Sequence, residues 1–227
     1  MKVVAVIPAW NEASRLRGVL ASLKSRVAEV IVVDDGSHDD TAEVARSEGA
    51  HVLSHRINRG QGAALKTGTL AALERGADII LHLDADGQHD PATLETLVEP
   101  LRSNQLDIVY GSRFLGIPAE GMPHSRRVLL HAARLFSTYA LGIPHTITDP
   151  QSGLRAMRAE VARALVFDQD GMAHCSEILR FVTRSPFRWG EVPIRVHYTE
   201  ASLKKGQKAS HAMKIVWELL LGELVRK

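Results

Sequence analysis

Asp84 and Asp86 stand two residues apart directly after an apolar run, and Gln88 follows within the same expected turn. Their oxygen-bearing side chains can converge on one ion at the end of a strand. Hard divalent cations prefer oxygen ligands, and Mg²⁺ commonly uses one or two protein carboxylates together with substrate phosphates. The spacing therefore favours a cation that neutralises a diphosphate, although the same triplet also occurs in acidic loops that cap helices.

Two further acidic stretches follow apolar runs in the same way. Asp35 belongs to an Asp-Asp-Gly-Ser run, and Glu12 follows Pro8 and Trp10 at the end of the first apolar run. Carboxylates suit ribose hydroxyls and a base N–H, and an indole offers a surface for base stacking. The alternative roles are a turn, a helix cap, or an interaction of Glu12 with a helix dipole. For Asp35 we favour contact with a ligand.

Residues 58–62, Asn-Arg-Gly-Gln-Gly, form a glycine-rich entry to a helix that could approach a phosphate. The run lacks the G-x-G-x-x-G pattern and also the lysine of a Walker motif. The sequence therefore argues against an NAD enzyme and against a P-loop ATPase.

The elements that must position these residues alternate along the first half of the chain. Short apolar runs at 3–7, 30–33, 79–83 and 108–110 are separated by longer segments of helical period, which is the pattern of parallel strands joined by crossover helices. Asn11 is expected to cap the first of these helices, and Asp90 with Pro91 to open a later one. Ligands of open α/β sheets bind outside the carboxyl ends of the strands, so the loops with unusual residues should line one rim.

From Met122 the pattern changes to longer helices, expected at 125–141 and 174–184, with a strand-like run at 192–196. The boundary near residue 115 is expected to divide two lobes of one domain. A chain of 227 residues is long enough for one well-buried α/β domain of this kind.

Composition limits the functional classes. Acidic clusters fall in the first 100 residues, whereas Arg, Lys and His crowd the stretch 113–208, so the second half should attract anions. The single Cys175 cannot form an intrachain disulfide, and the first residues lack the pattern of a secretory signal. No run approaches the roughly 18 to 20 apolar residues that span a bilayer. We therefore expect a cytoplasmic protein, peripheral to the cytoplasmic face of a membrane, with no nucleic-acid partner.

Six motifs follow one another along nearly the whole chain. They are P-A-W-N-E at 8–12, D-D-G-S at 34–37, N-R-G-x-G at 58–62, D-A-D-G-Q-H at 84–89, G-S-R at 111–113 and D-P-Q-S-G at 149–153. Together they resemble the inverting family 2 glycosyltransferases, and most closely the dolichol- or polyprenyl-phosphate mannosyl- and glucosyltransferase branch. The resemblance implies an α/β fold of the GT-A type, with a mostly parallel central sheet flanked by helices and a C-terminal helical region on the acceptor side.

The resemblance also implies the roles of individual residues. A nucleotide-sugar would contact Pro8, Ala9, Trp10, Glu12, Asp35, Asp84, Ala85 and Asp86, and Mg²⁺ or Mn²⁺ would be held by Asp84, Asp86 and Gln88. The acceptor and phosphates would contact Arg113, Arg126, Arg127, Lys204 and Lys205, and the catalytic residues would be Asp86, Arg113 and Asp149. Residues 1–115 would form the nucleotide-sugar-binding half of a single catalytic domain over 1–227, and 116–227 the acceptor-side half. Gln61 stands where this branch usually has Lys, and the loop after Tyr198 matches only loosely.

The type of acceptor follows from protonation chemistry. A sugar hydroxyl normally needs a general base, whereas a lipid phosphate, with a second pKa of about 6 by analogy with phosphorylated side chains, is largely ionised at neutral pH. A phosphate acceptor instead requires cations, and the amphipathic segment around Arg126, Arg127 and Arg134 supplies them. This segment could lie at an anionic membrane surface or simply cover a core, and the segment 213–225 could meet lipid, a membrane-protein partner or its own core.

We therefore expect metal-dependent inverting transfer of a hexose, from a donor of the GDP-mannose or UDP-glucose type, to polyprenyl or dolichyl phosphate. One alternative keeps the donor but uses a soluble sugar or a phosphorylated small molecule as the acceptor. Another is a nucleotide-sugar-binding protein without catalytic activity.

Overall fold

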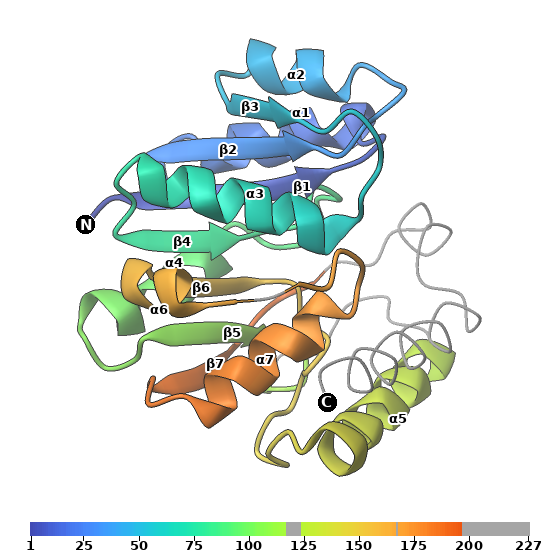
Figure 1. Ribbon diagram of the computed structural model, residues 1–227, viewed down its shortest axis with the longest axis vertical. Helices are drawn as coiled ribbons and strands as arrows, with labels where there is room; N and C mark the ends of the chain where they lie inside the picture. The colour runs from blue at the N-terminus through green and yellow to red at the C-terminus, as the bar shows by residue number, and fades with distance from the viewer. Residues whose placement is uncertain (117–123, 167, 197–227) are drawn as a thin grey trace.

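The computed structural model describes residues 1–116, 124–166 and 168–196 (Figure 1). The predicted roles of Lys204, Lys205 and the segment 213–225 fall outside the described residues, and so does the role of the Arg126 side chain. The strands and helices below therefore refer to these three ranges.

A seven-stranded sheet forms the centre of the molecule, with the strand order β3-β2-β1-β4-β6-β5-β7. Its strands are β1 (Val3–Ala9), β2 (Glu29–Asp34), β3 (His51–Ser54), β4 (Ile79–His82), β5 (Ile108–Ser112), β6 (Arg155–Arg158) and β7 (Trp189–Pro193). All neighbouring pairs are parallel except those of β6, which runs antiparallel to both β4 and β5. The sheet is therefore mostly parallel, as the sequence predicts, with one reversed strand inside it.

Helices cover both faces of the sheet (Figure 1). One core lies beneath α1 (Ala13–Leu23), α2 (Thr41–Ser47) and α4 (Thr93–Arg102), and the other beneath α3 (Gln61–Glu74), α6 (Ala159–Ala164) and α7 (His174–Arg184). The remaining helix, α5 (His124–Leu141), contacts α7 beside this sandwich. In the described ranges, none of the helices has both the length and the apolar character needed to cross a bilayer.

Strand β1 illustrates why the apolar runs become central strands. Ala5 and Ile7 pack into the core beneath α1 and α4, whereas Val4 and Val6 pack into the core beneath α3. A strand that is buried on both faces has no polar alternation, because each fully buried aliphatic side chain stabilises the fold by about 1.5–3 kcal/mol. The continuous run in the sequence is therefore the signature of a central position.

Two local predictions differ from the structure, and one strand was not predicted. Asn11 does not cap the first helix: it adopts φ 53°, and its side-chain oxygen accepts a hydrogen bond of 2.8 Å from the His38 N–H. The last strand spans 189–193 and not 192–196, since Val196 forms only an isolated bridge with His89. Strand β6 was not predicted, because arginines at both of its ends hide its apolar centre.

Candidate active site

The carboxyl ends of β1, β2, β4 and β5 meet at one edge of the sheet, because these strands run in the same direction. Strand β6 runs the opposite way, so the chain enters β6 at this same edge. The four loops expected to form a rim therefore lie together, and the segment before β6 joins them.

Asp84 follows β4 and is held from two sides. Gln61 Nε2, at the start of α3, donates a hydrogen bond of 2.7 Å to Asp84 Oδ1, and His89 Nε2 lies 3.7 Å from Oδ2. Although burial raises the pKa of the Asp84 carboxyl, the contact with His89 and the positive charge of Arg155 bring this pKa below its ordinary value. Asp84 is therefore an ionised carboxylate with a fixed orientation.

Asp86 and Gln88 lie in the turn that follows. The Gln88 N–H donates to Asp86 Oδ1 at 3.0 Å, and Gly87 between them adopts φ 73°, which glycine tolerates best. Burial, and then the charge of Asp84, raise the pKa of the Asp86 carboxyl. Two carboxylates that repel each other, with a neutral amide oxygen nearby, fit a divalent cation, which would relieve the repulsion. The described residues contain no cluster of three or more His, Cys, Asp and Glu side chains that could hold a metal ion.

The end of β1 presents the residues predicted to face the nucleoside. Ala9 is buried, Pro8 is half-buried, and the Trp10 side chain is 49% exposed. Glu12 Oε2 accepts a hydrogen bond of 2.9 Å from Arg15 Nη1, so the Glu12 side chain does not cap the helix that begins beside it. Trp10 therefore offers a flat apolar surface at this edge.

Asp35 organises the protein around it. Its Oδ1 accepts hydrogen bonds from His55 Nδ1 at 2.6 Å and from the Arg59 N–H at 3.0 Å, and its Oδ2 accepts one from the Gly60 N–H at 2.7 Å. His55 Nε2 lies 2.9 Å from Thr67 Oγ1. Asp35 is 3% exposed, so its carboxylate mainly shapes the loop that leads into α3.

The glycine-rich entry to α3 is covered by another part of the chain. The N–H groups of Gly62 and Ala63 donate to the Asp170 carbonyl oxygen at 2.8 and 3.2 Å. A Cβ on Gly62 would lie 2.0 Å from the Gln169 carbonyl oxygen, so only glycine admits this loop. Glu177 holds the loop in turn, because its Oε2 accepts from the Gln169 N–H at 2.9 Å. The Asp170 carbonyl oxygen therefore takes up two of the amides that open this helix.

Arg113, which follows β5, is paired with Asp149. Arg113 Nε donates to Asp149 Oδ2 at 2.6 Å and Nη2 donates to Oδ1 at 2.7 Å, which forms a two-pronged ion pair. The Asp149 side chain is 1% exposed and that of Arg113 is 12% exposed. Asp149 therefore forms its ion pair with Arg113.

The segment 149–154 connects the two halves of the site. Its Gly153 packs against Asp84 so closely that a Cβ there would lie 2.8 Å from Asp84 Oδ2, and the Gly111 N–H donates to the Leu154 carbonyl oxygen at 2.9 Å. The motif D-P-Q-S-G thus contacts the acidic loop with its glycine and the arginine with its aspartate. The contact of Gly153 with Asp84 was not predicted. The glycine at the end of the D-P-Q-S-G motif was the one sign in the sequence that another group packs closely there.

A buried basic group lies beside Asp84. The strand register pairs Arg155 with His82 on β4 and with Tyr110 on β5, so the three side chains form a row on one face of the sheet. All three are buried, and burial keeps the pKa of His82 well below its ordinary value. The sequence does not predict this row, because nothing in it distinguishes Arg155 from the other arginines of the chain.

Helix α7 closes this row from above. His174 Nδ1 donates to the Gly171 carbonyl oxygen at 2.8 Å, so His174 Nε2 can accept from Arg155 Nη2 at 3.1 Å. Cys175 Sγ lies 3.4 Å from His174 Nε2. Burial raises the pKa of the Cys175 thiol, but His174 and Arg155 outweigh it and lower this pKa to about 7. Cys175 is a free and buried thiol.

Helix α5 carries both basic and apolar surface. Arg127 is exposed, while Val128, Leu135 and Tyr139 are 54%, 58% and 85% exposed. The His131 ring lies 5.3 Å from that of Phe114, which links α5 to the turn that carries Arg113.

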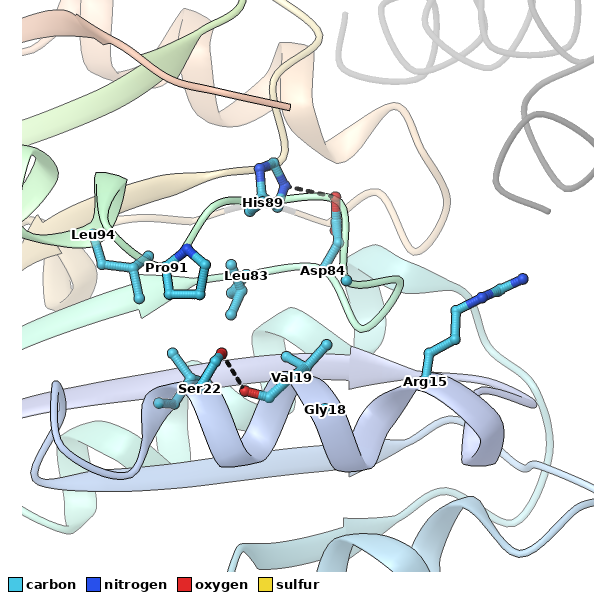
Figure 2. A pocket seen from close by; sticks show the side chains of 11 residues that line it. Arg15, Gly18, Val19, Ser22, Leu83, Asp84, His89, Pro91 and Leu94 are labelled. Carbon is cyan, nitrogen blue, oxygen red and sulfur yellow. Dashed lines mark hydrogen bonds and ion pairs between the residues drawn. The ribbon is translucent and has the colours of Figure 1, made fainter. Parts of the chain in front are cut away.

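A cavity of about 220 Å³ adjoins the acidic loop (Figure 2). It lies between α1 and the segment 83–94, and Leu83, Pro91 and Val19 supply apolar lining. Asp84 and His89 point toward each other at its edge. The imidazole of His89 therefore shields one side of the Asp84 carboxylate.

A doubly wound sheet with one reversed strand, an acidic loop after β4 and an arginine after β5 defines a glycosyltransferase of the GT-A class. Residues 4–166 match the model of glycosyl transferase family 2. The chain belongs to this family and is a glycosyltransferase.

Its relatives are in the branch that the motifs indicate. The chain is 32% identical to the UDP-N-acetylglucosamine--dolichyl-phosphate N-acetylglucosaminyltransferase of Methanococcus voltae, over 96% of this chain and 95% of that protein. It is 38% identical to the undecaprenyl-phosphate mannosyltransferase of Micrococcus luteus, over 74% and 71% of the two chains. The glucosyl-3-phosphoglycerate synthase of Mycobacterium tuberculosis, solved with Mn²⁺, UDP and glucosyl-3-phosphoglycerate, has a TM-score of 0.77 at 22% identity, over 99% of this chain and 79% of that chain. This last likeness shows the shared fold.

Proposed function

We propose that the enzyme transfers a hexosyl group from a nucleotide-sugar to a polyprenyl phosphate with inversion at the anomeric carbon. One observation carries the choice of acceptor: Asp149 is 2% exposed and gives both of its oxygens to Arg113. A carboxylate engaged in this way serves as the anchor of a cation, and a phosphate acceptor needs a cation and no general base. The dolichyl- and undecaprenyl-phosphate substrates in the names of its relatives support the same choice.

The donor side of the proposal uses the acidic loop. Asp84, Asp86 and Gln88 would hold Mg²⁺ or Mn²⁺, which supplies positive charge to the departing diphosphate. Burial, and then repulsion by Asp84, raise the pKa of Asp86, and the repulsion supports a cation there. Gln61 and His89 fix the Asp84 carboxylate, so a donor diphosphate bound through the cation would have a defined position against this loop. The exposed Trp10 would stack on the base.

In the reaction, a phosphate oxygen of the acceptor forms a bond to the anomeric carbon while the bond from that carbon to the diphosphate oxygen breaks. The electron pair leaves with the nucleoside diphosphate. Arg113 would stabilise the negative charges of the phosphates, since Asp149 holds its guanidinium in one orientation and no reorganisation is needed. Arg127 would add a second positive charge from α5.

We also propose that the enzyme works at the cytoplasmic face of a membrane as a peripheral protein. The exposed Val128, Leu135 and Tyr139 on α5, next to Arg127, suit an anionic interface. Co-sedimentation with vesicles of anionic and of neutral lipids tests this proposal. If the enzyme sediments equally with both kinds of vesicle, or with neither kind, the proposal is contradicted.

The test of function incubates the purified enzyme and Mg²⁺ or Mn²⁺ with a panel of UDP- and GDP-sugars, and offers polyprenyl phosphate, free sugars or phosphoglyceric acid as the acceptor. Mass spectrometry of the products should show a glycosylated polyprenyl phosphate. Products only from soluble acceptors would overturn the lipid acceptor and retain the donor site. Nucleotide-sugar binding without any product would favour a non-catalytic protein.

A further inference from the structure

Glu191 of β7 lies outside the six motifs, yet it holds the segment that carries Asp149. Its Oε2 accepts hydrogen bonds from the Thr148 N–H and from Thr148 Oγ1, both at 2.8 Å, and its Oε1 accepts one from the Asp149 N–H at 3.0 Å. A carboxylate that accepts from two successive backbone amides fixes the peptide between them. The backbone of Asp149 therefore has one position relative to β7.

The same carboxylate also orders a chain of hydroxyl groups. Because a carboxylate only accepts, Thr148 Oγ1 must donate to Glu191, and its lone pair is then available to the Ser112 hydroxyl, 2.6 Å away. Ser112 Oγ in turn accepts from the Phe114 N–H at 3.1 Å. Every donor in the chain therefore points toward Glu191, from the turn at the end of β5 to β7.

Arg113 lies between the two ends of this network. On one side its guanidinium forms the ion pair with Asp149, and its own N–H donates to Asp149 Oδ2 at 3.2 Å. On the other side its neighbours Ser112 and Phe114 belong to the hydroxyl chain. Glu191 thus fixes both the partner of Arg113 and the backbone on each side of Arg113.

We propose that Glu191 is a positioning residue for glycosyl transfer: it contacts no substrate and acts by holding Asp149 and the turn at 112–114, so that Arg113 points at the phosphates. The inference rests on the proposed role of Arg113 in the reaction. A displacement of about 1 Å in a positioned group can cost on the order of a hundredfold in rate. A disturbed network should therefore lower kcat more than it weakens the affinity for the donor.

The opposite ends of the same strands provide a matched control. Asp107, just before β5, accepts from Arg188 Nε at 3.0 Å and from Nη2 at 2.7 Å, and Arg188 lies just before β7. This pair also joins β5 to β7, but at the edge away from the site. Asp107→Asn should therefore lower the melting temperature and leave kcat unchanged, which is also what Glu191→Gln would do if Glu191 were only a clamp between strands.

The kinetic test compares wild type, Glu191→Gln, Asp107→Asn, Arg113→Ala and the double variant Glu191→Gln/Arg113→Ala. We expect Glu191→Gln to lower kcat by about tenfold to a hundredfold, with the donor KM changed less than about threefold. In the Arg113→Ala background the same change should cost nothing further, because Glu191 acts through Arg113. Multiplicative losses in the double variant, or a lower melting temperature with an unchanged kcat, would overturn the proposal.

A second measurement needs no acceptor. The Nε–H of Arg113, identified in an ¹⁵N spectrum by its loss in Arg113→Lys, should exchange slowly with solvent because it is bonded to the buried Asp149. Exchange should become faster in Glu191→Gln and in the milder Thr148→Val, and should stay slow in Asp107→Asn. Unchanged exchange in both test variants would overturn the positioning role. If wild type transfers sugar to no acceptor, the proposed function fails, whatever the exchange shows.

Discussion

Replacing Gly153 with alanine should weaken metal binding by the acidic loop while the fold remains. The added Cβ would lie 2.8 Å from Asp84 Oδ2 and 3.2 Å from Oδ1. The backbone of Gly153 does not have a positive φ, so alanine there causes no backbone strain. The collision with Asp84 is therefore the main consequence of the substitution.

The size of the effect follows from this geometry. An ordinary contact begins at 3.4 Å, so the carboxylate oxygen must move by about 0.6 Å. The moving atom ends a side chain, so the cost in folding free energy should be about 1–3 kcal/mol. Asp84 Oδ1 is also held by Gln61 at 2.7 Å, so the shift disturbs this hydrogen bond. Displacing Asp84, the proposed metal ligand, together with its partner should lower the apparent metal affinity by about 10- to 100-fold.

The assay is binding of Mn²⁺ in the presence of UDP or of GDP, followed by the electron paramagnetic resonance signal of the free ion. Gly18→Ala is the matched control, because a Cβ at Gly18 in α1 meets no atom within 4 Å. That variant should bind Mn²⁺ like wild type and gain about 1 kcal/mol of stability from helix propensity. If Gly153→Ala is destabilised but retains wild-type Mn²⁺ affinity, Asp84 is not a ligand that this glycine positions, and the reasoning fails.

Three further predictions concern the nucleoside, the acidic loop and the fold. Trp10→Ala should weaken nucleotide binding by about tenfold or more, because a base loses its stacking surface; calorimetry with UDP and GDP measures this, and unchanged affinity for both would exclude stacking. Because burial and the charge of Asp84 raise the pKa of Asp86, protons should compete with Mn²⁺ for this carboxylate at pH values above the ordinary Asp pKa of about 3.9. Mn²⁺ titrations at several pH values should show that the affinity is lost on acidification, and a pH-independent affinity would contradict the prediction. The hydrogen bonds from Arg188 lower the pKa of Asp107 in the folded protein. This pair therefore stabilises the fold above the pKa that Asp107 has in the unfolded chain, and the stabilisation is lost as the pH falls through the lower pKa of the folded state. Asp107→Asn should flatten the curve of stability against pH in that acidic range, and superimposable curves for wild type and variant would count against the prediction.

Elements that are buried on both faces were readable from the sequence. Strands β1, β2, β4 and β5 appear as apolar runs because neither face meets water, and the carboxylates that follow them necessarily share one edge. The positions of Asp84 and Asp86 were therefore predictable without knowledge of any contact. Strand β6 was not, since its two arginines break the run.

The partners of the polar residues depend on contacts between distant parts of the chain. Asp149 meets Arg113 across 36 residues, and Glu191 meets Thr148 across 43 residues, and no local pattern encodes either pair. Asp35 shows the same limit. The turn chemistry of its motif was clear, but its burial beneath His55 and the loop before α3 depends on how two strands and a helix pack.

The direction of β6 has a consequence for how such enzymes diversify. The nucleotide end of the site is built on strands that lead into it, whereas the segment 142–154 arrives from outside the sheet and only then enters β6. Insertions, deletions or exchanges in its first part, residues 142–147, would leave the pairing of β4, β6 and β5 in register and would spare the contacts of Asp149 with Arg113 and of Gly153 with Asp84. Under the proposed function, this stretch could therefore change within a lineage without altering the loops that would hold the donor.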